Sequence, residues 1–125
     1  RVGLMRSVAE IGLGGLFLVG AAFNAVYTLG HTDDFYGSWA DNAWFGWARS
    51  LLRDQVIPNG VAVTVVVIGC QAAIAALILS RSDLVEAGLV GGGFFAVGAA
   101  VFSSPGGFGA NLALALAQFG LAFTR

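Results

Sequence analysis

Long stretches without a charged side chain constrain this chain more than any other feature. No charge occurs in residues 11–30, 56–80 or 87–124, and the last stretch is interrupted only by the turn sequence at 103–107. A bilayer core needs about 20 mainly apolar residues per helix, and lipid offers backbone amides no partner outside the helix itself. The sequence therefore predicts one all-α domain over residues 1–125, a polytopic bundle of four transmembrane helices near 8–29, 60–80, 85–103 and 108–124.

The arginines predict the orientation of these spans. With both termini inside, four arginines lie on the cytoplasmic side and two outside: Arg1, Arg6, Arg81 and Arg125 against Arg49 and Arg53. This follows the positive-inside rule. The first span is longer than a signal-peptide core and ends without a clean cleavage site, so we expect it to be retained. These observations predict a protein of the plasma (prokaryotic inner) membrane with both termini in the cytoplasm.

The composition excludes several classes of function. Hydrophobic residues make up 58% of the chain, charged residues 10%, and the net charge is -1, so a nucleic-acid partner is not expected. Lysine is absent and cysteine and histidine occur once each, which excludes Schiff-base chemistry, an intrachain disulfide and a bis-histidine haem. No self-contained catalytic motif occurs, and His31 beside Asp33 and Asp34 is a weak metal signal. We therefore predict no metal and no catalytic residue.

The outer segment 30–59 is the only sizeable loop predicted between spans. Asp41 and Asn42 can cap a helix that Pro58 ends, and its apolar face repeats at three and four residues through Trp44, Trp47, Ala48, Leu51, Leu52 and Gln55. Such a helix would lie in the outer interface with three tryptophans, Trp39, Trp44 and Trp47, as anchors. They form either an aromatic belt or part of a lid over a cavity.

Small residues predict close helix packing. The third span carries Gly88, Gly92, Ala96 and Ala100 at spacing four, and the fourth carries Ala113, Ala117 and Gly120. Helices in lipid associate through such faces, within the bundle or against another subunit. Residues 14–22 and 92–100 also match at seven of nine positions, which indicates either two related hairpins or chance in a Gly/Ala-rich chain. Cys70 is expected to be a small packing residue within the membrane.

Few polar side chains fall inside the predicted spans. At a rise of about 1.5 Å per residue, Gln71 and Gln118 lie near the midplane, and Asn24 and Asn111 lie roughly 8 Å toward the outside. The matched depths predict interhelical hydrogen bonds within each pair. The alternative is a polar-lined cavity for a quinone or lipid head group, because amides donate and accept without carrying charge. Arg6 and Glu10 are spaced for an i,i+4 ion pair, and no deeper acid or histidine supports a proton pump.

Arg6 and the segment 12–24, Gly-Leu-Gly-Gly-Leu-Phe-Leu-Val-Gly-Ala-Ala-Phe-Asn, resemble the opening helix of the DoxX-like membrane proteins. The resemblance extends to the whole layout and implies four transmembrane helices with a longer first outer segment. That family includes a small subunit of a thiosulfate:quinone oxidoreductase. No residue here matches a catalytic motif of the family, so no active site is implied.

Three functions fit these observations. The leading hypothesis is a non-catalytic accessory or scaffold subunit of a larger membrane complex, with lipids and other subunits or a second copy as partners. The second is a DoxX-like redox subunit that holds a quinone near Asn24, Gln71, Asn111 and Gln118, with electrons supplied by a partner enzyme. The third is a small transporter or lipid carrier with the Trp44/Trp47 helix as its lid. No bound cofactor is predicted beyond such a quinone or lipid.

Overall fold

The structure is a computed structural model that describes residues 2–124, with side chains from Gly3 onward. Within these residues every regular element is helical. The long helices are α1 (Val2–Val26), α4 (Gly60–Leu79), α5 (Val85–Val101) and α6 (Pro105–Phe123). Between α1 and α4 lie a 3₁₀ turn η1 (Thr28–Gly30), α2 (Thr32–Asn42), α3 (Gly46–Leu51), a π-helical turn η2 (Leu52–Val56) and a 3₁₀ turn η3 (Ile57–Asn59).

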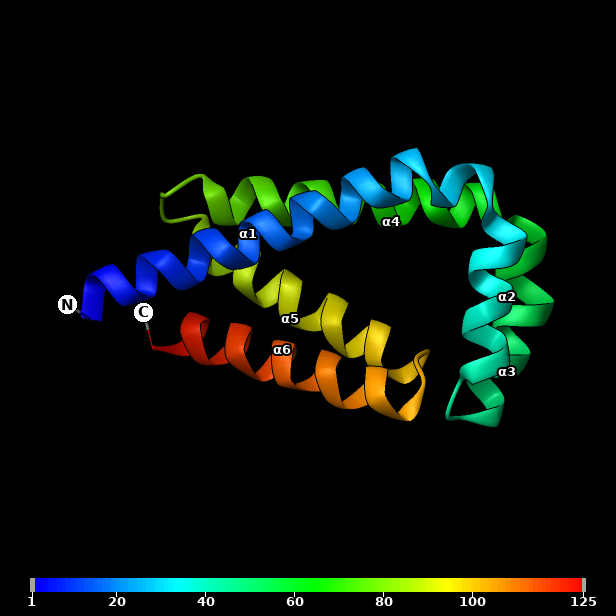
Figure 1. The fold of residues 1–125 in the computed structure, drawn as a ribbon. Coiled ribbons are helices and arrows are strands. Elements are labelled where there is room, and N and C mark those ends of the chain that lie inside the picture. The colour runs from blue at the N-terminus through cyan, green and yellow to red at the C-terminus, as the bar shows by residue number, and fades with distance from the viewer. Residues whose placement is uncertain (1, 125) are drawn as a thin grey trace.

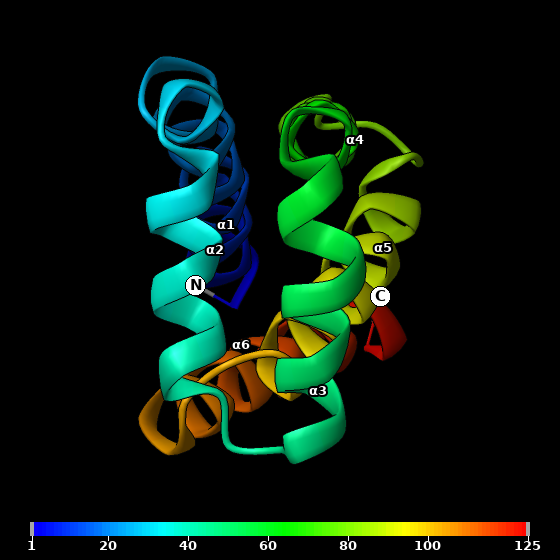
Figure 2. The ribbon, with the colours of Figure 1, turned by 90° about the vertical axis from the view of Figure 1, so that its right-hand side faces the viewer.

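The four long helices form two antiparallel pairs. Helix α1 packs along α4 and α5 packs along α6, and the pairs meet at the end that holds both termini of the described chain (Figure 1). Toward the other end the pairs diverge, and α2 and α3 stand side by side across the opening (Figure 2). The molecule therefore has a closed end and an open end, and the short helices cover the open one.

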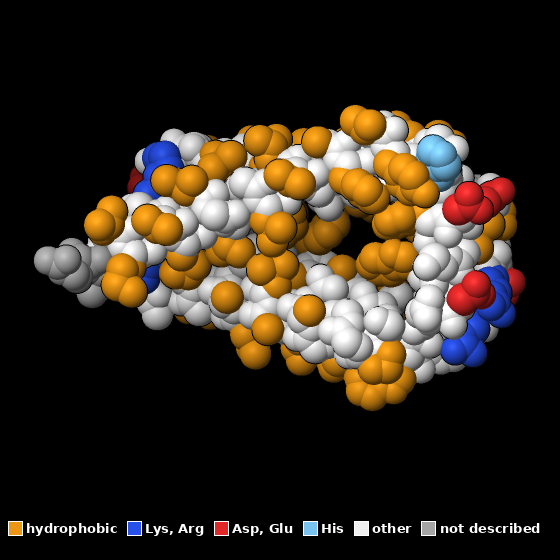
Figure 3. All heavy atoms as spheres, in the orientation of Figure 1, with side chains coloured by type: hydrophobic (Ala, Val, Ile, Leu, Met, Phe, Trp, Pro, Cys, Tyr) orange, Lys and Arg blue, Asp and Glu red, His pale blue; other side chains and the backbone are white. Residues whose placement is uncertain are grey.

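Three helical stretches are long and apolar enough to cross a membrane: Gly3–Gly30, Gly46–Leu79 and Pro105–Phe123. The fourth, α5, is apolar but only 17 residues long. Hydrophobic side chains are spread over the face shown in Figure 3. On the whole surface some large ones are more than two-thirds exposed, such as Met5 at 68% and Val26 at 85%. A surface of this kind is typical of a protein in contact with lipid.

One stripe of α1 is buried from Glu10 onward. Its members are spaced by four and three residues, and they are Glu10, Gly14, Phe17, Ala21, Asn24 and Thr28 in η1. Gly14 shows how close the two helices come, since an added Cβ would lie 2.6 Å from Leu79 Cγ of α4. The spacing of three and four keeps these residues on one helical face, which explains why a single stripe meets α4.

The predicted small-residue face of α5 is buried within the bundle. All four of its members, Gly88, Gly92, Ala96 and Ala100, are buried. A Cβ on Gly88 would come within 2.9 Å of the Ile78 backbone nitrogen on α4, and a Cβ on Gly92 would meet the Gln118 side chain on α6. This face therefore packs the two hairpins together and is not left over for another subunit.

The two similar segments, 14–22 and 92–100, meet in the structure. They lie on α1 and α5, which run in the same direction (Figure 1). Phe17 and Phe95, at equivalent positions of the two segments, contact edge to face with ring centroids 5.6 Å apart. Contact between equivalent residues on parallel helices fits two hairpins related by an axis along the helices.

The prediction for residues 30–59 is wrong in its details. Asp41 and Asn42 do not begin a helix but end α2, because Ala43 is extended (φ −60°, ψ 135°) and breaks the chain before Gly46. The signal for α2 was present at Thr32, Asp33 and Asp34, since acidic residues favour the first turn of a helix. Segment 30–59 is thus two short helices rather than a loop carrying one.

The prediction that Pro58 ends a helix is wrong. It sits in the first turn of η3, where proline's missing N–H costs no hydrogen bond. The π turn before it and the 3₁₀ turn around it change the hydrogen-bond register, so the chain continues from α3 through η2 and η3 into α4 without a loop. The axis changes direction over these turns (Figure 1).

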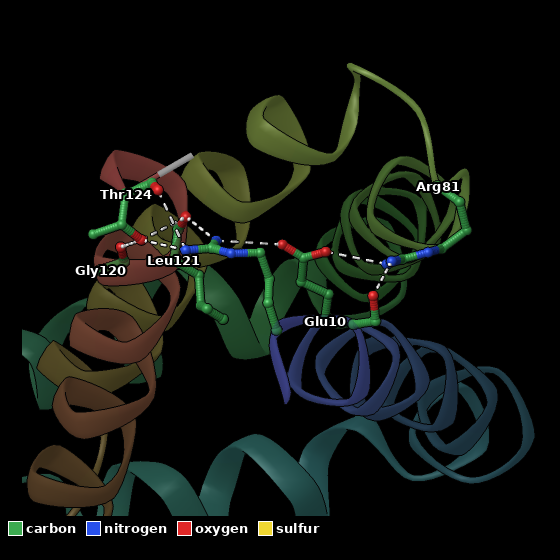
Figure 4. Close-up of polar contacts among 7 residues, drawn as sticks. Glu10, Arg81, Gly120, Leu121 and Thr124 are labelled. Atoms are coloured by element: carbon green, nitrogen blue, oxygen red, sulfur yellow. Dashed lines mark hydrogen bonds and ion pairs between the residues drawn. The ribbon is translucent and has the colours of Figure 1, made fainter. Parts of the chain in front are cut away.

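Charged side chains fasten the closed end (Figure 4). Glu10 of α1 is 1% exposed and lies 3.7 Å from Arg6 and 3.1 Å from Arg81, which follows α4. Arg6 also donates to the Leu121 carbonyl (2.8 Å) and to Thr124 Oγ1 (2.6 Å) at the end of α6. The Arg6–Glu10 pair predicted from spacing is therefore present, and it belongs to a network that joins α1, the α4–α5 turn and α6.

Candidate functional site

A cavity of about 580 Å³ lies between the two hairpins at the open end. It is hollowed into the face shown in Figure 3. The walls are mostly apolar and aromatic, with three carboxamide side chains among them. They come from all four long helices and from the cover: Gly20, Phe23, Asn24, Phe35, Tyr36, Trp39, Leu52, Val56, Val63, Val67, Gln71, Phe95, Gly98, Ala99, Phe102 and Asn111. None of these side chains carries a formal charge.

Helices α2 and α3, with the residues that join them, form the cover of the cavity, and α2 lies on its inner side. Phe35, Tyr36 and Trp39 share one face of α2 by their spacing, and they line the cavity at the open end of the molecule. The buried Tyr36 hydroxyl is 2.7 Å from Thr64 Oγ1, which fixes α2 to α4. Thr64 also donates to the Gly60 carbonyl (2.7 Å), so its own hydroxyl proton is already used and Tyr36 acts as the donor.

The far end of the cover is attached to the second hairpin. The Trp44 amide donates to the Ser103 carbonyl (3.0 Å) in the α5–α6 turn. Trp44 and Phe108 contact edge to face at 5.1 Å, and Trp47 contacts Phe102 at 5.8 Å. Because one end of the cover is bound to α4 and the other to the α5–α6 turn, it bridges the two diverging pairs.

Two of the three predicted tryptophan anchors lie at the surface. Trp44 is 53% and Trp47 is 54% exposed, as interfacial anchors require, whereas Trp39 faces the cavity. The lid predicted from Trp44 and Trp47 therefore has other residues on its inner face, those of α2. Arg49 holds the α2–α3 turn, since it donates to the carbonyls of Ala40 (3.2 Å) and Ala43 (3.0 Å) at the end of α2.

Asn24 and Gln71 form a directed chain of hydrogen bonds on the first hairpin. Thr28 Oγ1 donates to Asn24 Oδ1, and Asn24 Nδ2 donates to Gln71 Oε1, and both donor–acceptor distances are 2.8 Å. Thr28 is fully buried and Asn24 is 8% exposed. Gln71 Nε2 is the last group of the chain, and within residues 2–124 it donates to no protein acceptor.

Asn111 faces the same cavity from the second hairpin. Its Nδ2 donates to the Gly107 carbonyl one turn earlier in α6 (2.9 Å), which leaves Oδ1 as an acceptor. Three of the four amides predicted as ligands are thus brought together, from α1, α4 and α6. Donor and acceptor groups on opposite walls of an apolar cavity are the usual way in which proteins orient a small ligand.

Gln118 is not part of this cavity. It is fully buried between α5 and α6, where Nε2 donates to the Leu114 carbonyl (3.3 Å) and Oε1 lacks a partner among the described residues. Its Oε1 occupies the space that a side chain on Gly92 would need. Gln118 therefore fills a gap created by a glycine, and its predicted role as a ligand residue is not supported by its position.

The pairing predicted from matched depth is also wrong. Asn24 bonds to Gln71 rather than to Asn111, and Gln118 bonds to the Leu114 carbonyl rather than to Gln71. Depth alone cannot say which helices are neighbours. Helices α1 and α4 form one pair and α5 and α6 the other, so amides on different hairpins are held apart where the pairs diverge.

The predictions for Cys70 and His31 concern residues that lie at the surface in the structure. Cys70 is exposed on α4 rather than packed. The His31 ring stacks on Tyr27 with centroids 4.2 Å apart, and Nδ1 lies 2.8 Å from the Tyr27 carbonyl. Among the described residues no group of three or more potential metal ligands comes together.

Comparison with family models, with curated proteins and with solved structures gave no match to this chain. The resemblance to the DoxX-like proteins therefore stays a prediction based on the residues of the first span.

Proposed function

We propose that this chain is a small membrane protein of four crossing helices that binds an amphiphile, a quinone or a lipid, in the cavity between its hairpins. In this proposal α5 also crosses the bilayer. Its length of 17 residues is at the lower end of the range of about 17 to 25 residues for a spanning helix. The closed end with its arginines lies at the cytoplasmic side of the plasma membrane, and α2 and α3 lie at the outer interface.

The observation that carries the proposal is the meeting of three carboxamides in an otherwise apolar and aromatic cavity. Asn24, Gln71 and Asn111 come from three different helices and face a space of about 580 Å³. This volume is within the range of about 300 to 1,000 Å³ typical of small-molecule sites. An uncharged, hydrogen-bonding head group on an apolar chain matches such walls.

The position of the opening supports a ligand that arrives from the bilayer. The hollow in Figure 3 faces sideways, across the long helices, and hydrophobic side chains surround it. With the long helices crossing the membrane, this direction leads into lipid and not into water. A quinone ring or a lipid head with part of its chain reaches the amides by lateral movement.

The test is to identify what the purified protein carries. We expect mass spectrometry of an organic extract of the protein, isolated in mild detergent, to contain a quinone or a neutral lipid at a fixed molar ratio. Gln71→Leu and Asn111→Leu are expected to lower that ratio severalfold. Gln118→Leu is the matched control, because it removes a buried amide outside the cavity. Equal ligand content in all three variants would contradict the proposal.

An accessory-subunit role is a second candidate, and one observation favours it. The small-residue face of α6 is exposed, in contrast to that of α5. It comprises Gly109, Ala113, Ala117 and Gly120. Such a face allows another helix to approach closely in lipid. Under this proposal Ala113→Leu abolishes co-purification of a companion subunit, whereas Leu116→Ala on the neighbouring exposed surface retains it.

A further inference from the structure

We propose that Thr28 sets the head-group preference of the cavity, so that it selects neutral amphiphiles whose head carries a hydrogen-bond acceptor such as a ketone or ester oxygen. The proposal rests on the ligand-binding function above and deepens it. Thr28 does not line the cavity. It acts as a positioning residue, through the amides that do.

The direction of the hydrogen-bond chain is the basis for this preference. The hydroxyl proton of Thr28 is given to Asn24 Oδ1, which leaves Asn24 Nδ2 to donate to Gln71 Oε1. Since a carboxamide has one acceptor oxygen and one donor nitrogen, fixing the oxygen of Gln71 determines that its NH₂ group is the free end. A head group at this wall must therefore accept a hydrogen bond.

Burial makes the order difficult to reverse. Thr28 is fully buried and Asn24 is 8% exposed, so the protein itself has to supply the partner of the Thr28 hydroxyl, and a buried polar group without a partner is costly. The Gln71 amide also has a fitted place. A Cβ on Gly20 would lie 2.7 Å from Gln71 Nε2, so the missing side chain of Gly20 provides the space in which this nitrogen lies.

The lack of charged side chains on the cavity wall also favours an uncharged head group. Among the lining residues the polar side-chain groups are the three carboxamides, the Trp39 indole N–H, which is a further donor, and the Tyr36 hydroxyl, which is already bound to Thr64. An ammonium or carboxylate head would be desolvated there without a counter-ion, which is strongly unfavourable. The site thus fits an uncharged acceptor and rejects charged lipids by the absence of a partner for them.

A single-tryptophan protein provides the measurement. Trp44→Phe and Trp47→Phe, both outside the cavity lining, leave Trp39 on its wall as the only tryptophan. In phosphatidylcholine nanodiscs, decylbenzoquinone quenches Trp39 when it binds, and methyl undecyl ketone or dodecane displaces it. We expect the ketone to displace the quencher at about three- to tenfold lower mole fraction than the alkane, as one hydrogen bond predicts.

Variants at Thr28 test the assigned role. With Thr28→Val, Asn24 Oδ1 loses its donor and can accept from Gln71 instead, which turns Gln71 Oε1 to the cavity. The ketone-to-alkane ratio should then fall to about one, and Thr28→Ser should restore it because the hydroxyl returns. A ratio that is unchanged in Thr28→Val, or not restored in Thr28→Ser, overturns the role of Thr28.

The outcomes separate this inference from the proposed function. Saturable quenching with equal displacement by ketone and alkane in the Thr28 protein means that the cavity binds amphiphiles without reading their heads, which overturns only the inference. Absence of saturable Trp39 quenching overturns both. If Thr28→Val fails to fold, Thr28→Ala takes its place as the variant without a hydroxyl, and Thr28→Ser remains the control that restores it. Gln71→Leu on the Thr28 background should remove the ketone preference while alkane displacement persists.

Discussion

The two ends of the molecule hold the same four helices by different means. At the closed end an ionic network around Glu10 and close contacts at glycines bring the hairpins together. At the open end aromatic side chains and amides line a cavity, and α2 and α3 bridge the gap. A small bundle can thus contain a binding space without extra length, because its two helix pairs meet at one end and diverge at the other (Figure 1).

Removal of the buried charge should have the largest effect on the closed end. We expect Glu10→Gln to lower the free energy of unfolding by about 1 to 3 kcal/mol, since it takes a buried partner from Arg6 and Arg81, which are themselves 24% and 41% exposed. The control is Asp41→Asn, which removes a 2.8 Å pair with Arg53 that is exposed and should cost below about 1 kcal/mol. Unfolding by dodecyl sulfate in mixed micelles, followed by circular dichroism, measures both. Equal losses would show that burial of Glu10 adds nothing.

A methyl group where α5 packs tightly against α4 should have the next largest effect. A Cβ at Gly88 would lie 2.8 Å from Leu77 Cβ and 2.9 Å from a backbone nitrogen, neither of which can move freely. We expect Gly88→Ala to cost about 1 to 3 kcal/mol in the same assay. Gly91→Ala is the matched control because its nearest atom, Ile74 Cγ1, is 3.7 Å away. Tolerance of both substitutions would refute the close packing of α4 and α5.

The two glutamines should respond in opposite directions. Gln71→Leu leaves the Asn24 donor without its partner and should cost about 1 kcal/mol. Gln118→Leu removes a buried oxygen that has no partner within residues 2–124 and should stabilise the protein by about 1 kcal/mol. Thermal unfolding of both variants in the same detergent compares them. A loss on Gln118→Leu equal to that on Gln71→Leu would mean that both amides hold the bundle together.

The smallest expected effect concerns the cover. Tyr36→Phe removes one hydrogen bond to Thr64, which keeps its own bond to Gly60. The stability loss should be about 0.6 kcal/mol, while hydrogen exchange in α2 should accelerate. Tyr27→Phe is the control, since the Tyr27 hydroxyl makes no hydrogen bond to another described residue. Slower or unchanged exchange in Tyr36→Phe would show that α2 is held by its other contacts.

The helical class and the apolar stretches followed from the sequence because charge-free runs of this length leave the backbone few alternatives. Residue spacing also predicted the Arg6–Glu10 pair and the packing face that begins at Gly88. Both are local properties of a single helix. Prediction failed at Asp41 and Pro58, where a β-conformation at one alanine and a change of helical register decided the path of the chain.

The site was predicted by residue type but not by arrangement. Amides in an apolar span are rare enough to mark a site, and three of the four do line the cavity. Which amides bond to each other depends on the pairing of helices, which depth estimates do not contain. The aromatic face of Phe35, Tyr36 and Trp39 was missed because segment 30–59 was treated as a loop, although its spacing of three and four was present.

Arg81 has a consequence for the order in which the chain assembles. It adopts a left-handed conformation (φ 56°) just after α4, where glycine is the usual residue, at a cost of about 1 to 2 kcal/mol. Its ion pair with Glu10 offsets that cost, and Glu10 belongs to α1, 71 residues earlier in the chain. The α4–α5 turn consequently reaches its lowest free energy only after α1 has docked, which makes the N-terminal helix a template for the hairpin that follows it.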